Sequence, residues 1–276
     1  MDGSGFLRQL KSGKRLYGTA VSSGDPLWPA AVKRTGVDFV FIDTEHTPLD
    51  RATVARMCLA YTALGLPPLV RIPSPDPYQA CQVLDAGAAG VLAPYIEDPE
   101  QVTNLVGATK LRPLKGRRLA TALDDPASLE PELRTYLNQR NAGKFLLINV
   151  ESVPALERLD RILAVPGLDG VIIGPHDLSV SLAVPEQYTH PRFEEAVARI
   201  VGKVSARGLA IGIHFPGPCE LQVKWAQKGV NIILHSSDAM IFEWSLARDI
   251  RAIRKELRED SPDPPGEARH THPRPA

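Results

Sequence analysis

Short runs of apolar residues recur along the chain, separated by longer segments that contain polar residues. Runs of this length, rich in Val, Ile, Leu and Phe, are typical of strands that are covered on both faces. They span 17–21, 38–42, 68–71, 89–93, 145–150, 169–173, 209–213 and 230–234. Eight strands that alternate with helices form a closed barrel, and 276 residues are enough for one. We therefore predict an α/β fold, a TIM (β/α)8 barrel.

Apolar residues at helical spacing follow the runs. In residues 49–64 these are Val54, Met57, Cys58 and Tyr61, and residues 152–163 repeat the pattern. An amphipathic helix is predicted over 238–256, after the last strand. Helices therefore follow strands throughout the chain.

Two segments depart from this alternation. Residues 110–144 are too long for a typical connection, and we expect a loop over the barrel mouth that contains a helix near 129–138. After Leu257 the chain is almost free of apolar residues. We expect residues 1–258 to form a single domain and 259–276 to form a disordered polar tail.

Charge and cysteine content narrow the possible functions. The chain has 32 Lys and Arg residues and 32 Asp and Glu residues, so no net positive charge attracts nucleic acid or a membrane surface. Three scattered cysteines, Cys58, Cys81 and Cys219, form no paired ligand motif. No apolar run approaches the roughly 18 residues of a membrane helix. These features favour a cytoplasmic protein that contacts neither nucleic acid nor membrane.

Polar residues stand directly after several of the runs. Glu151 follows the fifth run and Asp177 the sixth. The carboxyl ends of parallel strands meet on one face of a barrel, so these two carboxylates could hold a divalent cation. Another interpretation, that both stabilise the first turn of the following helix, stays open.

Asp43, Glu45 and His46 follow the second run, and Arg71 closes the third. An imidazole at this place suits proton transfer, although a loop histidine is also common on surfaces. Arg71 could bind a carboxylate or an enolate oxygen of a substrate, or form an ion pair with Asp43 or Glu45. No Lys stands at a strand end, which disfavours Schiff-base chemistry and favours metal-assisted chemistry.

Asp85 stands near the end of a predicted helix, just before Gly87. The helix dipole disfavours an acid at this end, so another interaction, such as orientation of an imidazole, should explain it.

The chain resembles the class II, metal-dependent pyruvate aldolases of the HpcH/HpaI aldolase/citrate lyase family over residues 6–256. The resemblance rests on five motifs: Ile42 to His46, Val70-Arg71, Leu84 to Ala88, Asn149 to Glu151, and Val165 to Ser179. Within this family, the chain is similar to aldolases that act on 4-hydroxy-2-oxoheptanedioate or 2-dehydro-3-deoxy-glucarate. The implied reaction is reversible cleavage of a 4-hydroxy-2-oxo acid to an aldehyde and pyruvate, or a related 2-oxo acid such as hydroxypyruvate.

The resemblance also implies roles for individual residues. Glu151 and Asp177 would bind Mg²⁺, Mn²⁺ or Co²⁺, and His46, held by Asp85, would be the general base. Arg71 would stabilise the enolate oxygen, and Asn149, Gly174 and His176 would line the substrate site. The implied assembly is a hexamer, a trimer of dimers, in which the last helix packs on a neighbouring subunit.

Three positions depart from the family pattern. Asn149 replaces a Gln, His176 replaces a small residue, and residues 112–118 replace an aromatic-Pro-Pro-Gly segment. These departures affect the expected substrate.

Two other functions stay open at this point. One is a lyase of coenzyme A thioesters, of the malyl-CoA or citramalyl-CoA type, for which Arg112, Lys115, Arg117 and Arg118 would bind the nucleotide. The other is a metal-free structural or regulatory barrel.

Overall fold

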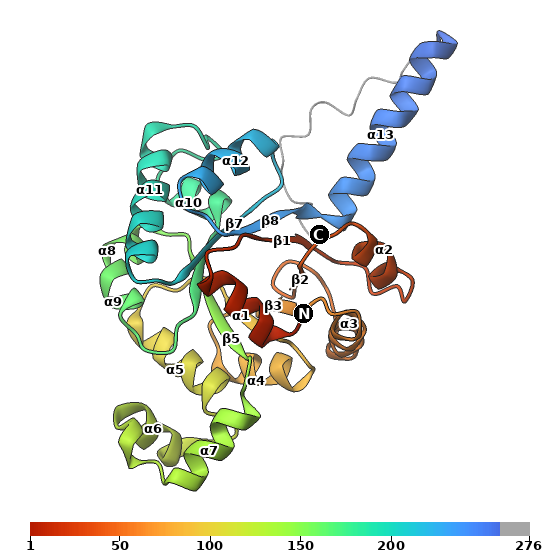
Figure 1. The fold of residues 1–276 in the computed structure, drawn as a ribbon. Helices are drawn as coiled ribbons and strands as arrows, with labels where there is room; N and C mark the ends of the chain where they lie inside the picture. Colours follow the sequence, from red (N-terminus) through yellow and green to blue (C-terminus); the bar gives the residue numbers. More distant parts are fainter. Residues whose placement is uncertain (260–276) are drawn as a thin grey trace. The chain divides into compact units, whose positions relative to one another are not determined.

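The computed structural model describes residues 1–259, and eight parallel strands form a closed barrel in sequence order (Figure 1). The strands are β1 (Leu16–Ala20), β2 (Phe39–Asp43), β3 (Pro68–Arg71), β4 (Gly90–Ala93), β5 (Phe145–Val150), β6 (Gly170–Ile173), β7 (Ala210–Phe215) and β8 (Ile232–Ser237). Each begins or ends within a few residues of the predicted run. The predicted TIM barrel is confirmed.

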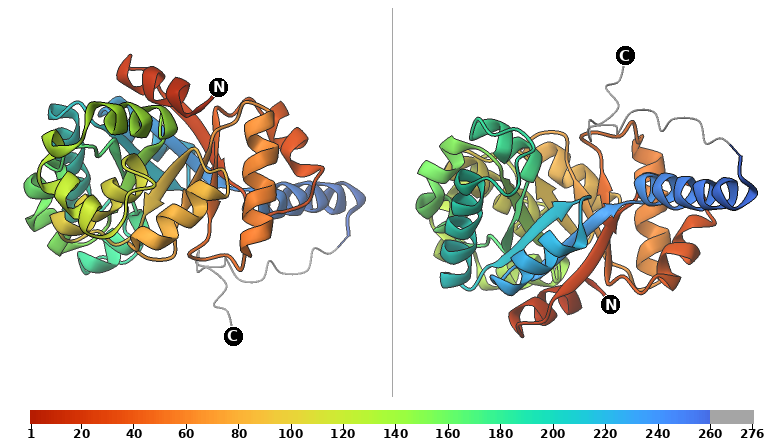
Figure 2. Two further views of the ribbon diagram at one scale, coloured as in Figure 1. Left: turned by 90° about the horizontal axis from the view of Figure 1, so that it is seen from below. Right: turned by 90° about the horizontal axis from the view of Figure 1, so that it is seen from above.

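Helices surround the strands, as the two views of Figure 2 show. The helices of residues 1–259 are α1 (Gly3–Lys11), α2 (Trp28–Arg34), α3 (Arg51–Ala63), α4 (Pro77–Asp85), α5 (Pro99–Lys110), α6 (Gly116–Asp124), α7 (Pro131–Arg140), α8 (Val153–Glu157), α9 (Leu159–Leu163), α10 (Pro175–Ser181), α11 (Pro191–Ala206), α12 (Cys219–Gln227) and α13 (Asp238–Leu257). A short 3-10 helix covers Pro126–Ser128. Asp50 and Asp76 begin α3 and α4 by accepting backbone N–H bonds, which satisfies donors that a helix leaves free at its start.

Alternation of side chains along each strand separates two cores. In β2, Phe39 and Phe41 belong to the core inside the barrel, whereas Val40 and Ile42 belong to the core between strands and helices. The same alternation turns Leu69 of β3 inward. Asp43 and Arg71 come two residues after inward side chains, so they also face the barrel axis.

Helix α1 covers the amino ends of the strands. The ring of Phe6 stacks on Phe145 with centroids 4.5 Å apart and meets Phe39 edge-on at 5.3 Å. Both partners are the first residues of their strands. The amino end is therefore packed with aromatic side chains, which leaves the carboxyl end for polar groups.

The segment between α5 and β5 contradicts the prediction of a loop over the barrel mouth. It contains α6 and α7, which lie together at one end of the barrel unit, and β5 begins beside them (Figure 1). Asn141 donates hydrogen bonds to the carbonyl oxygens of Lys110 and Arg112, which holds the segment next to the amino end of β5. The predicted helix near 129–138 is present as α7.

The chain divides into two compact units, of which the first is Met1–Asp238 and the second begins at Ala239. Helix α13 therefore belongs, after its first residue, to the second unit. Of the polar tail predicted over 259–276, residues 260–276 lie outside the described part of the chain.

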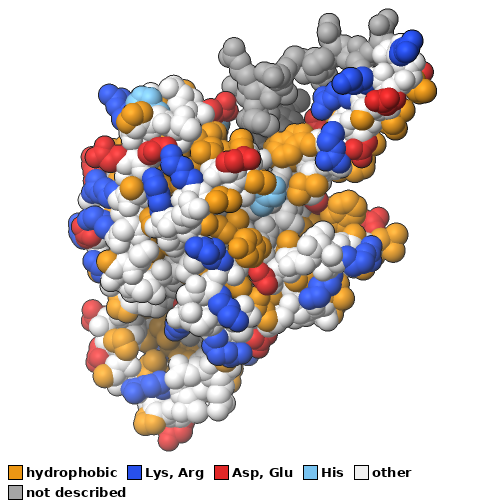
Figure 3. Space-filling view, turned by 45° about the horizontal axis from the view of Figure 1, so that its top comes forward, with side chains coloured by type: hydrophobic (Ala, Val, Ile, Leu, Met, Phe, Trp, Pro, Cys, Tyr) orange, Lys and Arg blue, Asp and Glu red, His pale blue; other side chains and the backbone are white. Residues whose placement is uncertain are grey.

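Charged side chains of both signs are mixed on the surface. Figure 3 shows basic and acidic side chains interspersed on the viewed face, without an extended area of one sign. Among residues 1–259 no helix has the length and hydrophobicity to cross a membrane.

Candidate active site

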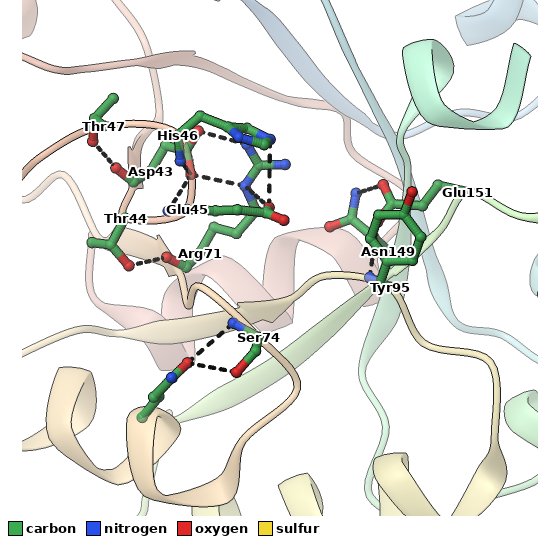
Figure 4. A network of polar contacts seen from close by, with 11 residues as sticks. Asp43, Thr44, Glu45, His46, Thr47, Arg71, Ser74, Tyr95, Asn149 and Glu151 are labelled. Carbon is green, nitrogen blue, oxygen red and sulfur yellow. Dashed lines mark hydrogen bonds and ion pairs between the residues drawn. The ribbon is translucent and has the colours of Figure 1, made fainter. Parts of the chain in front are cut away.

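Arg71 lies at the centre of a group of carboxylates at the carboxyl end of the barrel. Asp43 and Arg71 are register partners on β2 and β3. Arg71 Nε donates to Asp43 Oδ1 at 2.9 Å, Nη2 donates to Asp43 Oδ2 at 2.5 Å, and Nε lies 3.1 Å from Glu45 Oε2. The ion pair that the sequence left open is therefore formed. Figure 4 shows the guanidinium facing across the site toward Asn149 and Glu151.

Arg71 and the carboxylates around it stabilise one another's charged forms. Burial opposes the charge of Arg71, but the hydrogen bonds and charges of Asp43, followed by Glu45 and Glu151, raise the pKa of Arg71. Burial likewise acts against ionised Asp43, yet contacts with Arg71 lower the pKa of Asp43. Only 9% of Arg71 is exposed, so this permanent cation is held ready for a second anion.

His46 lies beside Glu45, with His46 Nε2 and Glu45 Oε2 3.7 Å apart. Burial raises the pKa of Glu45 to about 7, the charges of Asp43 and Asp177 add to this, and Arg71 opposes it. The imidazole is about half exposed, so a ligand at the barrel mouth can reach it.

Within one chain the structure places Asp85 away from His46, so the role of Asp85 in holding His46 stays a prediction. Asp85 is the last residue of α4, which runs from the carboxyl ends of the strands back to the amino ends. There it lies 3.2 Å from Arg112 Nη2, and its side chain is 69% exposed. This ion pair, together with solvent, accounts for an acid at the unfavourable end of the helix.

Glu151 is 3% exposed and each of its oxygens has a partner. Oε1 accepts a bond from the backbone N–H of Tyr95 at 2.8 Å, and Oε2 accepts one from Asn149 Nδ2 at 2.9 Å (Figure 4). Helix α8 is instead capped by Ser152, whose Oγ accepts from Ala155 N. The interpretation of Glu151 as a helix-capping residue is therefore wrong.

The carboxyl group of Glu151 lies in a negative environment. Burial raises the pKa of Glu151 to about 7, and the charges of Asp177 and Glu45 add to this effect, whereas the Tyr95 N–H and Arg71 oppose it. Asp177 stands in the first turn of α10, where a negative charge also complements the helix dipole. Both roles of Asp177 are compatible with this position.

Gly174 makes room for Glu151. A Cβ atom at residue 174 would lie 2.0 Å from Glu151 Oε2, so any side chain there would displace the carboxylate. This close approach explains on steric grounds why residue 174 is a glycine, which the sequence alone did not reveal.

The residues present fit a divalent cation held by Glu151 and Asp177. Burial is the main reason that the pKa of Glu151 is raised, and a cation would relieve the repulsion by Asp177 and Glu45 that adds to it. Carboxylate oxygens are the ligands that Mg²⁺ and Mn²⁺ prefer. In addition, Asn149 Oδ1 is buried and has no hydrogen-bond partner among residues 1–259. The same residues contain no group of three or more His, Cys, Asp or Glu placed to ligate a metal. Substrate and water would have to complete the coordination.

The two unusual substrate residues lie at different depths. Asn149 is 2% exposed and follows the inward side chain of Leu147 on β5. The side chain of His176 is about half exposed, with Nδ1 3.7 Å from Glu186 Oε1. Asn149 can contact the buried part of a ligand, whereas His176 can contact only its outer part.

Sequence reasoning missed one residue and left another unassigned. The missed residue is Tyr95, just after β4, which donates its backbone N–H to Glu151. Its place after Pro94, at the carboxyl end of a strand, was a signal that could have identified it as a site residue. His214 of β7 places its ring edge-on to Phe41 with centroids 5.3 Å apart, and its Nε2 lies 3.1 Å from the Ser236 carbonyl oxygen. His214 therefore also belongs to the inner lining of the barrel.

The basic residues considered for coenzyme A lie elsewhere. Arg112, Lys115, Arg117 and Arg118 belong to the segment between α5 and β5, at the amino end. Arg112 contacts Asp85, and Arg118 forms an ion pair with Glu130. The expected nucleotide patch at the mouth is thus contradicted.

Comparisons with known proteins identify the family of the chain. Residues 19–242 match the family model described as HpcH/HpaI aldolase/citrate lyase. The chain is 34% identical over 208 residues to "Hydroxypyruvate/pyruvate aldolase" of Roseobacter denitrificans, which covers 75% of this chain and 81% of the relative. It is 32% identical over 241 residues to "2-keto-3-deoxy-L-rhamnonate aldolase" of Salmonella gallinarum, which covers 87% of this chain and 90% of the relative.

A solved structure shows the same fold. The HpcH/HpaI aldolase from Desulfitobacterium hafniense superposes with a TM-score of 0.78 at 26% identity, over 90% of this chain and 96% of that one. The chain therefore belongs to the HpcH/HpaI aldolase/citrate lyase family of carbon–carbon lyases.

Proposed function

We propose that this protein is a divalent-metal-dependent aldolase that reversibly cleaves a 4-hydroxy-2-oxo acid into an aldehyde and pyruvate or hydroxypyruvate. The observation that carries the proposal is the meeting of Glu151, Arg71 and His46 at the carboxyl end of the barrel (Figure 4). The aldolase names of the relatives support the reaction class.

Each residue has a separate task in this reaction. A cation bound by Glu151 and Asp177 would supply Lewis-acid polarisation of the 2-oxo group. Arg71 would bind the oxygen that gains negative charge as the C3–C4 bond breaks. His46 would take the proton of the C4 hydroxyl, and the C4 oxygen would become the carbonyl oxygen of the aldehyde. The electron pair of the broken C3–C4 bond would stay on the 2-oxo acid as an enolate.

The test follows release of pyruvate or hydroxypyruvate from a panel of 4-hydroxy-2-oxo acids. Enzyme stripped with EDTA should be inactive, and Mn²⁺, Mg²⁺ or Co²⁺ should restore cleavage. No cleavage with any of the three cations would contradict the proposal and would revive the metal-free barrel.

Cation affinity should depend on pH, because a cation must displace the proton of Glu151. With the pKa of Glu151 raised to about 7, we expect the affinity for Mn²⁺ to fall by about tenfold between pH 8 and pH 6. Calorimetry in two buffers of different ionisation enthalpy measures both the affinity and the released proton. Equal affinity at the two pH values would contradict this role of Glu151.

Stability of the metal-free protein should change in the opposite sense. A raised carboxyl pKa in the folded state contributes stability that is present below the unfolded value of 4.5 and is lost as the pH rises through about 7. Added Mn²⁺ should restore the melting temperature at pH 8 more than at pH 6.

We also propose a hexamer, a trimer of dimers, in which α13 packs on a neighbouring copy. Large apolar side chains are exposed on successive turns of α13 (Figure 3), namely Phe242, Leu246, Ile250, Ile253 and Leu257. An apolar stripe of this length favours burial against another surface. Light scattering after size exclusion should give six times the 30.0 kDa of one chain. The mass of a single chain would contradict the assembly.

A further inference from the structure

Tyr95 has a backbone conformation that tyrosine seldom adopts. Its φ is +50°, in the left-handed region that favours glycine. The conformation places the Tyr95 N–H 2.8 Å from Glu151 Oε1. Unusual backbone of this kind persists where surrounding contacts hold it, and it is concentrated at functional sites.

The side chain of Tyr95 lies at the rim of the same site. In Figure 4 its ring stands beside Asn149 and Glu151. Tyr95 is 50% exposed, whereas Arg71, Asn149 and Glu151 are at most 9% exposed. A glycine would satisfy the backbone with less strain, so the presence of tyrosine indicates a use for the phenol ring or its hydroxyl.

Tyr95 is exposed and Arg71 and Glu151 are buried, and this difference indicates which end of a substrate each residue would contact. The inference rests on the proposed function, in which the 2-oxo acid end reaches the buried Arg71 and Glu151. The aldehyde end must then extend outward, toward the rim where Tyr95 stands.

Charge at the rim restricts what this end can carry. The carboxylates whose charges act on the Tyr95 hydroxyl are those of Asp177, Glu151, Glu45 and Glu97. A divalent cation would balance Asp177 and Glu151, and the single charge of Arg71 is shared between Asp43 and Glu45, so it balances only one of these two carboxylates. The remaining negative charge, together with that of Glu97, keeps the rim acidic, and a second carboxylate on the substrate would be repelled.

We propose that Tyr95 is a specificity-determining residue whose hydroxyl binds a hydroxyl group on the aldehyde part of the substrate. The substrate class is then an uncharged hydroxyaldehyde, rather than a semialdehyde that carries a carboxylate. This assignment adds the aldehyde half to the proposed reaction.

The experiment measures aldol addition of pyruvate, with Mn²⁺ present, to glycolaldehyde and to acetaldehyde. These aldehydes differ by one hydroxyl group. Tyr95→Phe removes only the phenolic oxygen and keeps the N–H that binds Glu151. We expect the variant to lose about tenfold in kcat/KM for glycolaldehyde, the size of one hydrogen bond, and to match the wild type on acetaldehyde.

Tyr136→Phe is the matched control, since Tyr136 is a similarly exposed tyrosine on α7. It should behave as wild type on both aldehydes, and the Mn²⁺ affinity of Tyr95→Phe should equal that of the wild type. Equal losses of Tyr95→Phe on the two aldehydes, or no loss on either, would overturn the role of Tyr95.

A second pair of aldehydes tests the charge argument. Succinic semialdehyde and butanal have the same chain length, and only the first carries a carboxylate. The wild type should use butanal with the higher kcat/KM, and a preference for the semialdehyde would overturn the substrate class. Absence of turnover by the wild type with every aldehyde would instead contradict the proposed function.

Discussion

Glu151→Gln is expected to abolish metal-dependent cleavage. The change keeps the shape of the side chain but removes the charge of the buried carboxylate that we propose as a cation ligand, and Lewis-acid stabilisation is worth several kcal/mol. We therefore expect turnover to fall on the order of 10³-fold, together with a loss of Mn²⁺ affinity of at least about 100-fold. Steady-state kinetics and calorimetric titration with Mn²⁺ measure the two effects.

A stability measurement separates this loss from misfolding. Because burial and the Asp177 charge raise the pKa of Glu151, the ionised side chain destabilises the metal-free fold above pH 7. Metal-free Glu151→Gln should accordingly melt at the same temperature as the wild type or higher at pH 8. Glu97→Gln is the matched control, because Glu97 accepts a bond from Ser152 Oγ at 2.6 Å and should not bind the cation. Full Mn²⁺ affinity in Glu151→Gln would show that the ligand assignment is incorrect.

His46→Ala is expected to separate proton transfer from metal binding. Positioned general bases contribute about 10²- to 10⁴-fold, so kcat should fall within this range. The affinity for Mn²⁺ should remain within about threefold of the wild type, because no proposed ligand is removed. Titration with Mn²⁺ and rapid-mixing kinetics on the best substrate of the panel measure the two quantities.

His190→Asn controls for loss of an imidazole. His190 Nδ1 accepts from Arg192 N at the start of α11, and asparagine can also cap a helix. This variant should keep wild-type kcat. If His46→Ala also kept it, another group would have to take the hydroxyl proton, and Glu45, with a pKa raised to about 7, would be the first to test.

The sequence identified most of the barrel because its signals are local. Strands buried on both faces need continuous apolar runs, and eight such runs match the eight strands of the barrel. Side-chain alternation along a strand is also local. It turns Asp43, Arg71 and Asn149 toward the axis once Phe41, Leu69 and Leu147 are known to face inward.

The differences between expectation and structure concern which end of the barrel a residue occupies. Residues 110–144 connect a helix to the next strand, and Asp85 ends a helix, so both lie at the amino end. The order of helices and strands along the chain already implied this position. The length of residues 110–144 instead suggested a loop at the mouth, and the acidic charge of Asp85 at the end of a helix suggested a partner such as an imidazole. The contact of Asp85 with Arg112, 27 residues further along the chain, supplied the actual explanation.

The sequence by itself determined the fold class, the order of the strands and the residues that the barrel brings to its carboxyl end. Local apolar patterns and chain connectivity suffice for these. Only the tertiary structure decided that Tyr95 N–H and Asn149 bind Glu151, that Gly174 makes room for it, and that Glu45 lies between Arg71 and His46. These contacts join residues from different strands and loops, and their distances depend on barrel closure, backbone conformation and burial, which no local pattern encodes.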